Sequence, residues 1–351
     1  MSLGTEHSPP SAAEGISLQI HDALPPGVAA LLPRIPRAEL AASDVWLNLV
    51  ARHYDRARGL WITAQSAGEM VGFLPAIRRR HRGVDRLESS LDGVVCGPQI
   101  LPDLPPRMRE AVFLALVHAL GKCVGGRCML AAYSCPVDAA APYLQTRPGK
   151  GWDTVRTCSA LVPCNGGIEA AEQQLASIRR RERDRSLRRG CTIQEERDPD
   201  QLALWYPQYR KRADRFAQEP VPLAFMQDLM HEAPESVVFG TVRREGELLG
   251  GHFGFISGGR LISWQGGVQD TRESGVFPVV LLYWLDIVAA CSRGLDAVDF
   301  GGSAGRSGLW DFKRRFGAVP EMRRQFQRRS RLGHLLLRTA RGYRSFVGPK
   351  S

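Results

Sequence analysis

The sequence contains none of the short motifs that identify a metal, nucleotide or dinucleotide site. Its eight cysteines include no CxxC pair and have no histidine at metal-ligand spacing, and HExxH is absent, so no metal site is expected. No GxGxxG occurs, and Arg306 occupies the place of the second Walker A glycine in the stretch 301–308. These absences argue against nucleotide hydrolysis and NAD chemistry. Local spacing gives no Ser/His/Asp or Cys/His arrangement either.

The chain also lacks long apolar runs and a recognisable signal peptide. Its longest apolar stretch, 276–285, ends at Asp286 and is shorter than the roughly 20 residues that cross a bilayer. Without a signal peptide, reduced and mostly buried thiols are the default. We therefore expect a cytoplasmic protein. Peripheral contact with the inner face of the plasma membrane is a further expectation from its charge.

Acidic residues are scarce at one end of the chain. The 351 residues are 44% hydrophobic and carry a net charge of +11, which is an ordinary globular composition with a basic excess. Residues 306–351 contain 13 Lys and Arg against only Asp311 and Glu321, so the rest of the chain is neutral. Such an end predicts a polyanionic neighbour: a nucleotide cofactor, tRNA or an anionic membrane. Phe326, Leu332, Leu335, Leu336 and Leu337 interleave with arginines over 323–346, and this pattern predicts a membrane-surface helix.

One pattern of elements occurs twice. Gly68-Glu69-Met70-Val71-Gly72 and Gly246-Glu247-Leu248-Leu249-Gly250 lie within apolar runs and predict two hairpins with glycine turns. An apolar helix (107–120 or 278–292) and then a strand (128–133 or 295–300) follow each hairpin. The predicted fold class is α/β with mixed sheets, in two similar tandem domains. The predicted boundaries are a disordered tail at 1–15, domains at 16–165 and 166–320, and a basic helix or tail at 321–351.

Arginine dominates a helix predicted over 168–189. Seven Arg stand against two acids between residues 179 and 190. The run is either a solvated face with local ion pairs or a surface that contacts a polyanion, and the sequence leaves both open. Arg180 and Arg183 are the candidate contacts.

The most site-like segment follows the strand 295–300. Asp299 lies near the end of this strand, where α/β sheets place ligand-binding groups. The loop Gly301-Gly302-Ser303 comes next, and Arg306 precedes a helix whose apolar stripe leaves Lys313 and Arg314 able to face the loop or solvent. Backbone N–H groups and cations in this order can hold a phosphate or another anion. A plain turn with a capping aspartate and surface cations is the structural alternative.

A second glycine-bearing loop follows Trp264 and Gln265. It runs past Arg272 to Gly275 and opens the helix 278–292. It could hold a pyrophosphate on backbone N–H groups, or it is an ordinary connection from strand to helix. His252, in the strand of the second hairpin, is expected to be a core histidine with its hydrogen bonds satisfied.

The segment DFGGS at 299–303, followed by LWDFKRRFG at 309–317, resembles the FemAB-like tandem acyltransferases, as do the paired hairpins and the basic helix. The resemblance runs from about Val45 to about Ala318. It implies two GNAT-fold domains that transfer an acyl group, from a CoA thioester or a tRNA ester, to an amine or hydroxyl without a covalent enzyme intermediate. It implies that Lys313 binds a phosphate or the developing oxyanion, and that Asp299 is a positioning group or a general base. Two family features are not recognisable: the pyrophosphate motif of single-domain GNAT enzymes in 270–275, and the long helical arm of peptidoglycan aminoacyltransferases.

The leading hypothesis is an acyltransferase that uses acyl-CoA to modify, on nitrogen or oxygen, a cell-envelope precursor or polysaccharide sugar, an anionic or lipid-linked substrate. The first alternative is transfer from aminoacyl-tRNA to a peptidoglycan precursor. The second is a non-catalytic tandem GNAT protein that binds polyanions or membranes. The predicted site consists of catalytic Asp299 and Lys313, of cofactor-binding Gly301, Gly302, Ser303, Arg306, Arg272 and Gly275, and of substrate contacts Trp264, Gln265, Arg180, Arg183 and Arg314.

Overall fold

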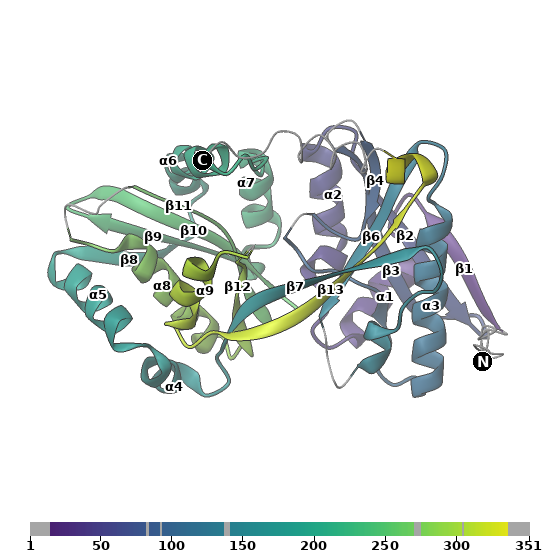
Figure 1. The fold of residues 1–351 in the computed structure, drawn as a ribbon, viewed down its shortest axis with the longest axis horizontal. Helices are drawn as coiled ribbons and strands as arrows, with labels where there is room; N and C mark the ends of the chain where they lie inside the picture. The colour runs from purple at the N-terminus through teal and green to yellow at the C-terminus, as the bar shows by residue number, and fades with distance from the viewer. Residues whose placement is uncertain are drawn as a thin grey trace, which may run out of the picture. The chain divides into compact units, whose positions relative to one another are not determined.

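The computed structural model describes residues 15–81, 84–91, 93–136, 141–269, 275–303 and 305–335. The chain divides into two compact units (Figure 1). The first contains the residues up to Arg156 and those from Arg324 onward, and the second is Thr157–Arg323. Residues 1–14 of the expected tail, Arg272, and residues 336–351 of the expected basic end lie outside the described residues.

The first unit is a mixed sheet with helices packed against it. Its strands are β1 (Ile16–His21), β2 (Arg58–Ser66), β3 (Glu69–His81), β4 (Val84–Glu88), β5 (Gln99–Ile100) and β6 (Cys128–Pro136), with the start of β7 (Trp152–Pro163) and the end of β13 (Val319–Arg329). Its helices are α1 (Pro26–Leu31), α2 (Asp44–His53) and α3 (Pro106–Lys122), with short 3-10 turns at Leu32–Arg34, Leu40–Ala42 and Pro142–Gln145. Strands β1 to β4 pair antiparallel in chain order, and β4 pairs parallel with β6.

The core of this unit lies between α3 and the sheet. Phe113, Leu116 and Val117 of α3 are fully buried there with residues of β2, β3 and β6. Tyr133 packs edge-on against Trp152 and stacks on Phe326 of β13, with ring centroids 5.0 Å apart.

The second unit repeats the plan with a longer set of elements. Its strands are the rest of β7, β8 (Cys191–Glu196), β9 (Val237–Arg244), β10 (Glu247–Ser257), β11 (Arg260–Val268), β12 (Ala297–Gly302) and the start of β13. Its helices are α4 (Gly167–Gln174), α5 (Ser177–Arg188), α6 (Pro199–Arg215), α7 (Leu223–Glu232), α8 (Pro278–Ser292) and α9 (Ser307–Arg314), with a 3-10 turn at Pro234–Ser236. The strand order is β7-β12-β11-β10-β9-β8.

Both predicted hairpins are confirmed, and their turns have the same geometry. Ala67 and Gly68 join β2 to β3 with φ of 51° and 82°, and Glu245 and Gly246 join β9 to β10 with φ of 52° and 82°. Two consecutive residues at positive φ are typical of the tight turns whose twist matches that of paired strands.

Strands β11 and β12 separate halfway along their length. They pair in parallel only from Arg260–Ala297 to Ile262–Asp299. Beyond that point β11 continues beside β10 as far as Val268, and β12 next pairs with β7 at Gly302. The described residues therefore leave the carboxyl-terminal halves of these two parallel strands without a ladder between them. Parallel strands place ligand sites at this end.

Glycines bring the helices close to both faces of the second sheet. α6 and α7 cover one face and α8 the other (Figure 1). A Cβ on Gly251 would lie 2.7 Å from Trp205 of α6, and one on Gly240 would lie 2.1 Å from Leu285 of α8. Both separations are far below van der Waals contact, so any larger residue would push the helix away.

Two predicted helices are wrong. The helix expected over 168–189 is broken, because Leu175 and Ala176 adopt extended backbone between α4 and α5. The surface helix expected over 323–346 is a strand as far as Arg329, and helix begins only at Arg331. β13 is hydrogen-bonded between β6 and β7, and pairing with strands so distant in the sequence cannot be read from local residue spacing.

Candidate acyl-transfer site

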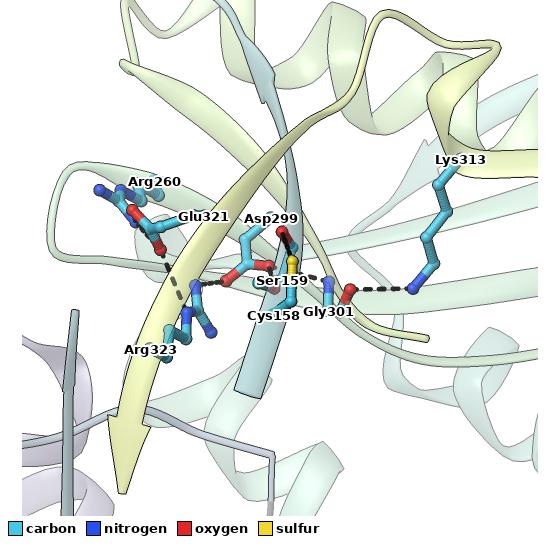
Figure 2. A network of polar contacts seen from close by, with 8 residues as sticks. All are labelled: Cys158, Ser159, Arg260, Asp299, Gly301, Lys313, Glu321 and Arg323. Atoms are coloured by element: carbon cyan, nitrogen blue, oxygen red, sulfur yellow. Dashed lines mark hydrogen bonds and ion pairs between the residues drawn. The ribbon is translucent and has the colours of Figure 1, made fainter. Parts of the chain in front are cut away.

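Asp299 of β12 is the centre of a buried polar network (Figure 2). Its side chain is fully buried, at 0% exposure. One carboxylate oxygen accepts hydrogen bonds from Ser159 Oγ at 2.5 Å and from the Gly301 N–H at 2.8 Å. The other forms an ion pair with Arg323 of β13. The carboxylate is therefore fully occupied by partners inside the protein.

The network continues outward through alternating charges. Glu321 accepts a hydrogen bond from Arg323 Nε at 3.1 Å and pairs with Arg260 Nη1 at 2.7 Å. Figure 2 shows this chain of side chains running from Arg260 to Asp299. Such a network fixes the end of β12, because each buried charge would be costly without its partner. Asp299 thus holds the strand from which the glycine loop emerges.

Lys313 lies on the opposite side of this loop. Its side chain is only 3% exposed, and its Nζ donates to the carbonyl oxygens of Gly301 and Gly302, both at 2.9 Å. Burial lowers the pKa of Lys313 to about 8, a shift that Asp299 opposes and Arg212 increases. An ammonium group has three N–H donors. Two are used by the loop, and the third has no hydrogen-bond partner among the described residues.

The glycine loop is arranged differently from a simple anion nest. The Gly301 N–H is bonded to Asp299, and the carbonyls of Gly301 and Gly302 face the lysine. Gly301 has a φ of 71°, which a residue without Cβ adopts most easily. Ser303 Oγ is buried and has no hydrogen-bond partner among the described residues, so it is the loop group that needs an external partner.

Three arginines gather around one aromatic ring beside this loop. Phe216, just after α6, is 38% exposed. The guanidinium groups of Arg212 and Arg215 lie 5.7 Å from its ring centroid, and that of Arg306 lies 4.8 Å from it. None of the three forms an ion pair with a carboxylate of the described chain. Their charges repel one another, so they favour an anionic ligand that can lie among them.

The arginines of α5 are used inside the protein. Arg183 pairs with Glu172 of α4 and lies 4.7 Å from the ring of Trp284, and Arg180 donates to the carbonyl oxygen of Glu172 at 2.9 Å. Arg179 is buried over Phe312, at 4.2 Å. This face of α5 fastens α4, α8 and α9 together, and Arg180 and Arg183 are committed to it.

The remaining predicted contacts are dispersed. Trp264 packs edge-on against Phe225 and Phe255, and Gln265 follows it in the separated half of β11. Gly275 lies against Arg189 of the α5 end, since a Cβ there would be 2.4 Å from that guanidinium group. Arg314 is exposed and pairs with Asp311 at 3.8 Å.

Sequence reasoning missed Ser159, Arg323, Arg212, Arg215 and Phe216. Ser159 and Arg323 are 140 and 24 residues from Asp299 along the chain, and no local pattern connects them. Arg212, Arg215 and Phe216 lie within about one turn at the end of α6. Their spacing of three and one residues was readable in the sequence.

Comparison with known proteins identifies the fold. Residues 173–314 match the family model of the acetyltransferase (GNAT) domain. The structure of FemX aligns with a TM-score of 0.66 at 12% identity, over 91% of this chain and 99% of FemX. A tandem GNAT protein from the clavulanic acid biosynthesis pathway aligns with a TM-score of 0.54 at 11% identity, over 90% of this chain and 98% of that protein. The structure of L-PGS from Bacillus licheniformis aligns with a TM-score of 0.54 at 13% identity, over 92% of this chain and 98% of L-PGS. Curated protein sequences give no match.

The second unit therefore contains a GNAT-type acetyltransferase domain, and the chain has a two-domain GNAT fold. More particularly, the fold is similar to that of FemX and of a tandem GNAT protein, which agrees with the fold that the FemAB-like resemblance of the sequence implied. In the described residues, no helix is long and apolar enough to span a membrane. No group of three or more His, Cys, Asp or Glu among them could hold a metal ion.

Proposed function

We propose that this protein is an acyltransferase that moves an acyl group from an acyl-CoA thioester to an amine or hydroxyl of an anionic cell-envelope precursor or polysaccharide sugar. The observation that carries the proposal is the buried Lys313 ammonium, held by the loop at the point where β11 and β12 separate. The resemblance of the sequence to the FemAB-like acyltransferases, which include peptidoglycan aminoacyltransferases, supports the envelope as the place of action. The cytoplasm is the proposed compartment, because acyl-CoA is made and used there.

Lys313 is the proposed oxyanion-stabilising group. When an acceptor attacks a thioester carbonyl, negative charge develops on the carbonyl oxygen. A fixed cation with one uncommitted N–H, in a site from which water is largely excluded, stabilises that charge without having to reorganise. Ser303 Oγ, buried without a partner among the described residues, is the proposed second donor. Asp299 acts through the loop as a positioning residue, because its own oxygens are occupied.

The three arginines around Phe216 are the proposed binding site for the anionic part of the acceptor. Guanidinium groups pair with phosphate or carboxylate in two parallel hydrogen bonds, and the exposed ring offers a face for a planar or sugar group. Arg306 directly precedes α9, the helix that carries Lys313, so an anion bound here lies near the helix of the proposed reacting group.

Calorimetric titration tests both assignments. Coenzyme A is the donor probe and UDP-N-acetylglucosamine the anionic acceptor probe. We expect Arg212→Ala to lower the affinity for the sugar nucleotide by about 10-fold or more, because one charged hydrogen bond is lost. The affinity for coenzyme A should be retained. Lys211→Ala, exposed on the same helix, is the matched control. The proposed function fails if coenzyme A does not bind, or if Lys313→Met leaves every measured transfer from acetyl-CoA unchanged.

A further inference from the structure

The second unit contains a buried acid–base pair that the site described above does not use. His252 of β10 is 6% exposed and Asp286 of α8 is 1% exposed. Their Nδ1 and Oδ2 atoms are 2.6 Å apart, and Ser263 of β11 donates a hydrogen bond to the same carboxylate oxygen. The second oxygen of Asp286 is buried and has no hydrogen-bond partner among the described residues.

This pair fixes which nitrogen of the imidazole carries its proton. Asp286 Oδ2, 2.6 Å from Nδ1, favours the tautomer with its proton on Nδ1, because two lone pairs would repel one another at this distance. The ring N–H does not point at Oδ2 closely enough to form a hydrogen bond. Nε2 is then the acceptor nitrogen of a neutral imidazole. A carboxylate behind Nδ1 also stabilises the imidazolium that forms when Nε2 takes a proton.

Nε2 lies beside the gap between β11 and β12. His252 pairs with Gly266 across the β10–β11 ladder, and a Cβ on Gly266 would be 3.5 Å from Nε2. Gly266 belongs to the half of β11 that has left β12. Gly266 therefore places no side chain against Nε2 in the half of β11 that is not paired with β12.

Tyr283 connects the imidazole to the Lys313 side of the gap. Its ring stacks on His252 at 5.5 Å and packs against Phe300 and Phe312, which flank the glycine loop and Lys313. Burial raises the pKa of Tyr283 to about 12; Asp286 adds to this shift and Arg212 reduces it. Asp286 and Tyr283, both from α8, are the ionisable groups that face His252 in the described structure.

We propose that His252 is the general base that accepts the proton of the attacking nucleophile. The proposal rests on the acyl-transfer function proposed above. A bond forms between the acceptor nitrogen or oxygen and the acyl carbon, and the acceptor proton moves to Nε2. The carbon–sulfur bond then breaks, the electron pair leaves with the coenzyme A sulfur, and the Nε2 proton neutralises that thiolate. Atoms and charges balance, and His252 returns to its neutral state.

Chemical modification tests the proposal without a known acceptor. Diethyl pyrocarbonate reacts with an accessible unprotonated imidazole nitrogen, and mass spectrometry locates the product among the eight histidines of the chain. We expect His252 to react in the folded protein, at a rate that bound coenzyme A lowers at least 5-fold. Exposed His231 on α7 is the internal control, and its rate stays unchanged.

The outcomes separate this inference from the proposed function. If coenzyme A binds but His252 reacts only after unfolding in guanidinium chloride, or reacts without protection, His252 is a structural core residue and the inference is overturned. If coenzyme A does not bind at all, the acyl-transfer function fails and the proton-transfer role fails with it.

A substitution gives the kinetic test. His252→Asn keeps an N–H at the place of Nδ1 and removes Nε2. With acetyl-CoA as donor and glucosamine as acceptor probe, we expect kcat to fall about 100-fold or more, with the acetyl-CoA KM and the unfolding midpoint little changed. Transfer to hydroxylamine, which attacks thioesters without a base, is retained. Equal losses with both nucleophiles would contradict a base role, and the modification experiment decides if glucosamine is not accepted.

Discussion

Replacing Arg323 with methionine should destabilise the second unit by leaving a buried carboxylate without its cation. Asp299 is fully buried, and Arg323 is its only ion-pair partner in the described structure. Removing one partner of a buried pair costs about 3–5 kcal/mol. Ser159 and Gly301 still donate to Asp299 in the variant, so we expect about 3 kcal/mol. For a unit of this size that corresponds to a lowering of Tm by roughly 6–12 °C.

A double-mutant cycle with Asp299→Asn separates the interaction energy between Arg323 and Asp299 from the contacts that each residue makes with its other neighbours. If the cost arises from the unpaired charge, the double variant should be at least about 1.5 kcal/mol more stable than the two single losses added together. Arg329→Met is the matched control on the same strand, because its partner Asp153 is half-exposed, and it should cost less than about 1 kcal/mol. Differential scanning fluorimetry and urea denaturation provide the two measurements. An Arg323→Met variant within 0.5 kcal/mol of the wild type would refute the reasoning.

Three further outcomes are expected. The pKa of Lys313 is about 8 in the folded protein and 10.5 in the unfolded chain. As pH rises from 8 to 10.5, the free energy of unfolding of the wild type should therefore increase relative to that of Lys313→Met. Parallel curves of unfolding free energy against pH would contradict the lowered pKa. Transfer activity that depends on the Lys313 ammonium should fall as pH rises through about 8, and Arg315→Ala, with an exposed side chain on the adjacent turn, should leave this profile unchanged. Gly267→Ala should cost about 1–3 kcal/mol, because its Cβ would lie 2.6 Å from the α6 backbone, whereas Gly308→Ala, with no atom within 4 Å, should be neutral or stabilising in urea denaturation.

Local patterns predicted the repeated elements and the position of the glycine loop, because both depend on residues close together in the chain. The hairpin turns need glycine at positive φ, and the apolar helix α8 needs only its own composition to show that it is buried. The direction in which each side chain points depends on distant partners. Lys313 turns inward because two carbonyl groups of the loop bind it, and Arg183 turns inward because Glu172 and Trp284 are there.

Charge counting overestimated the basic surface for the same reason. Arg179, Arg180 and Arg183 were indistinguishable in the sequence from Arg212 and Arg215. In the structure the three arginines of α5 contact carboxylates, carbonyl groups or aromatic rings inside the fold. The two arginines of α6 lie beside the exposed ring of Phe216. This difference supports the proposal that the α6 group, and not the α5 group, binds an anion.

Strand β13 makes the basic end of the chain part of both cores. Arg323 completes the polar network around Asp299 in the second unit, and Phe326, three residues later, stacks on Tyr133 in the core of the first. A chain that ends at Gly317 would lose both contacts, together with the strand that carries them. Loss of membrane or polyanion binding after such a truncation would therefore report unfolding. Exchange of exposed Arg331 for glutamate, which keeps β13 intact, is the change that tests whether the charge of this end binds an anionic surface.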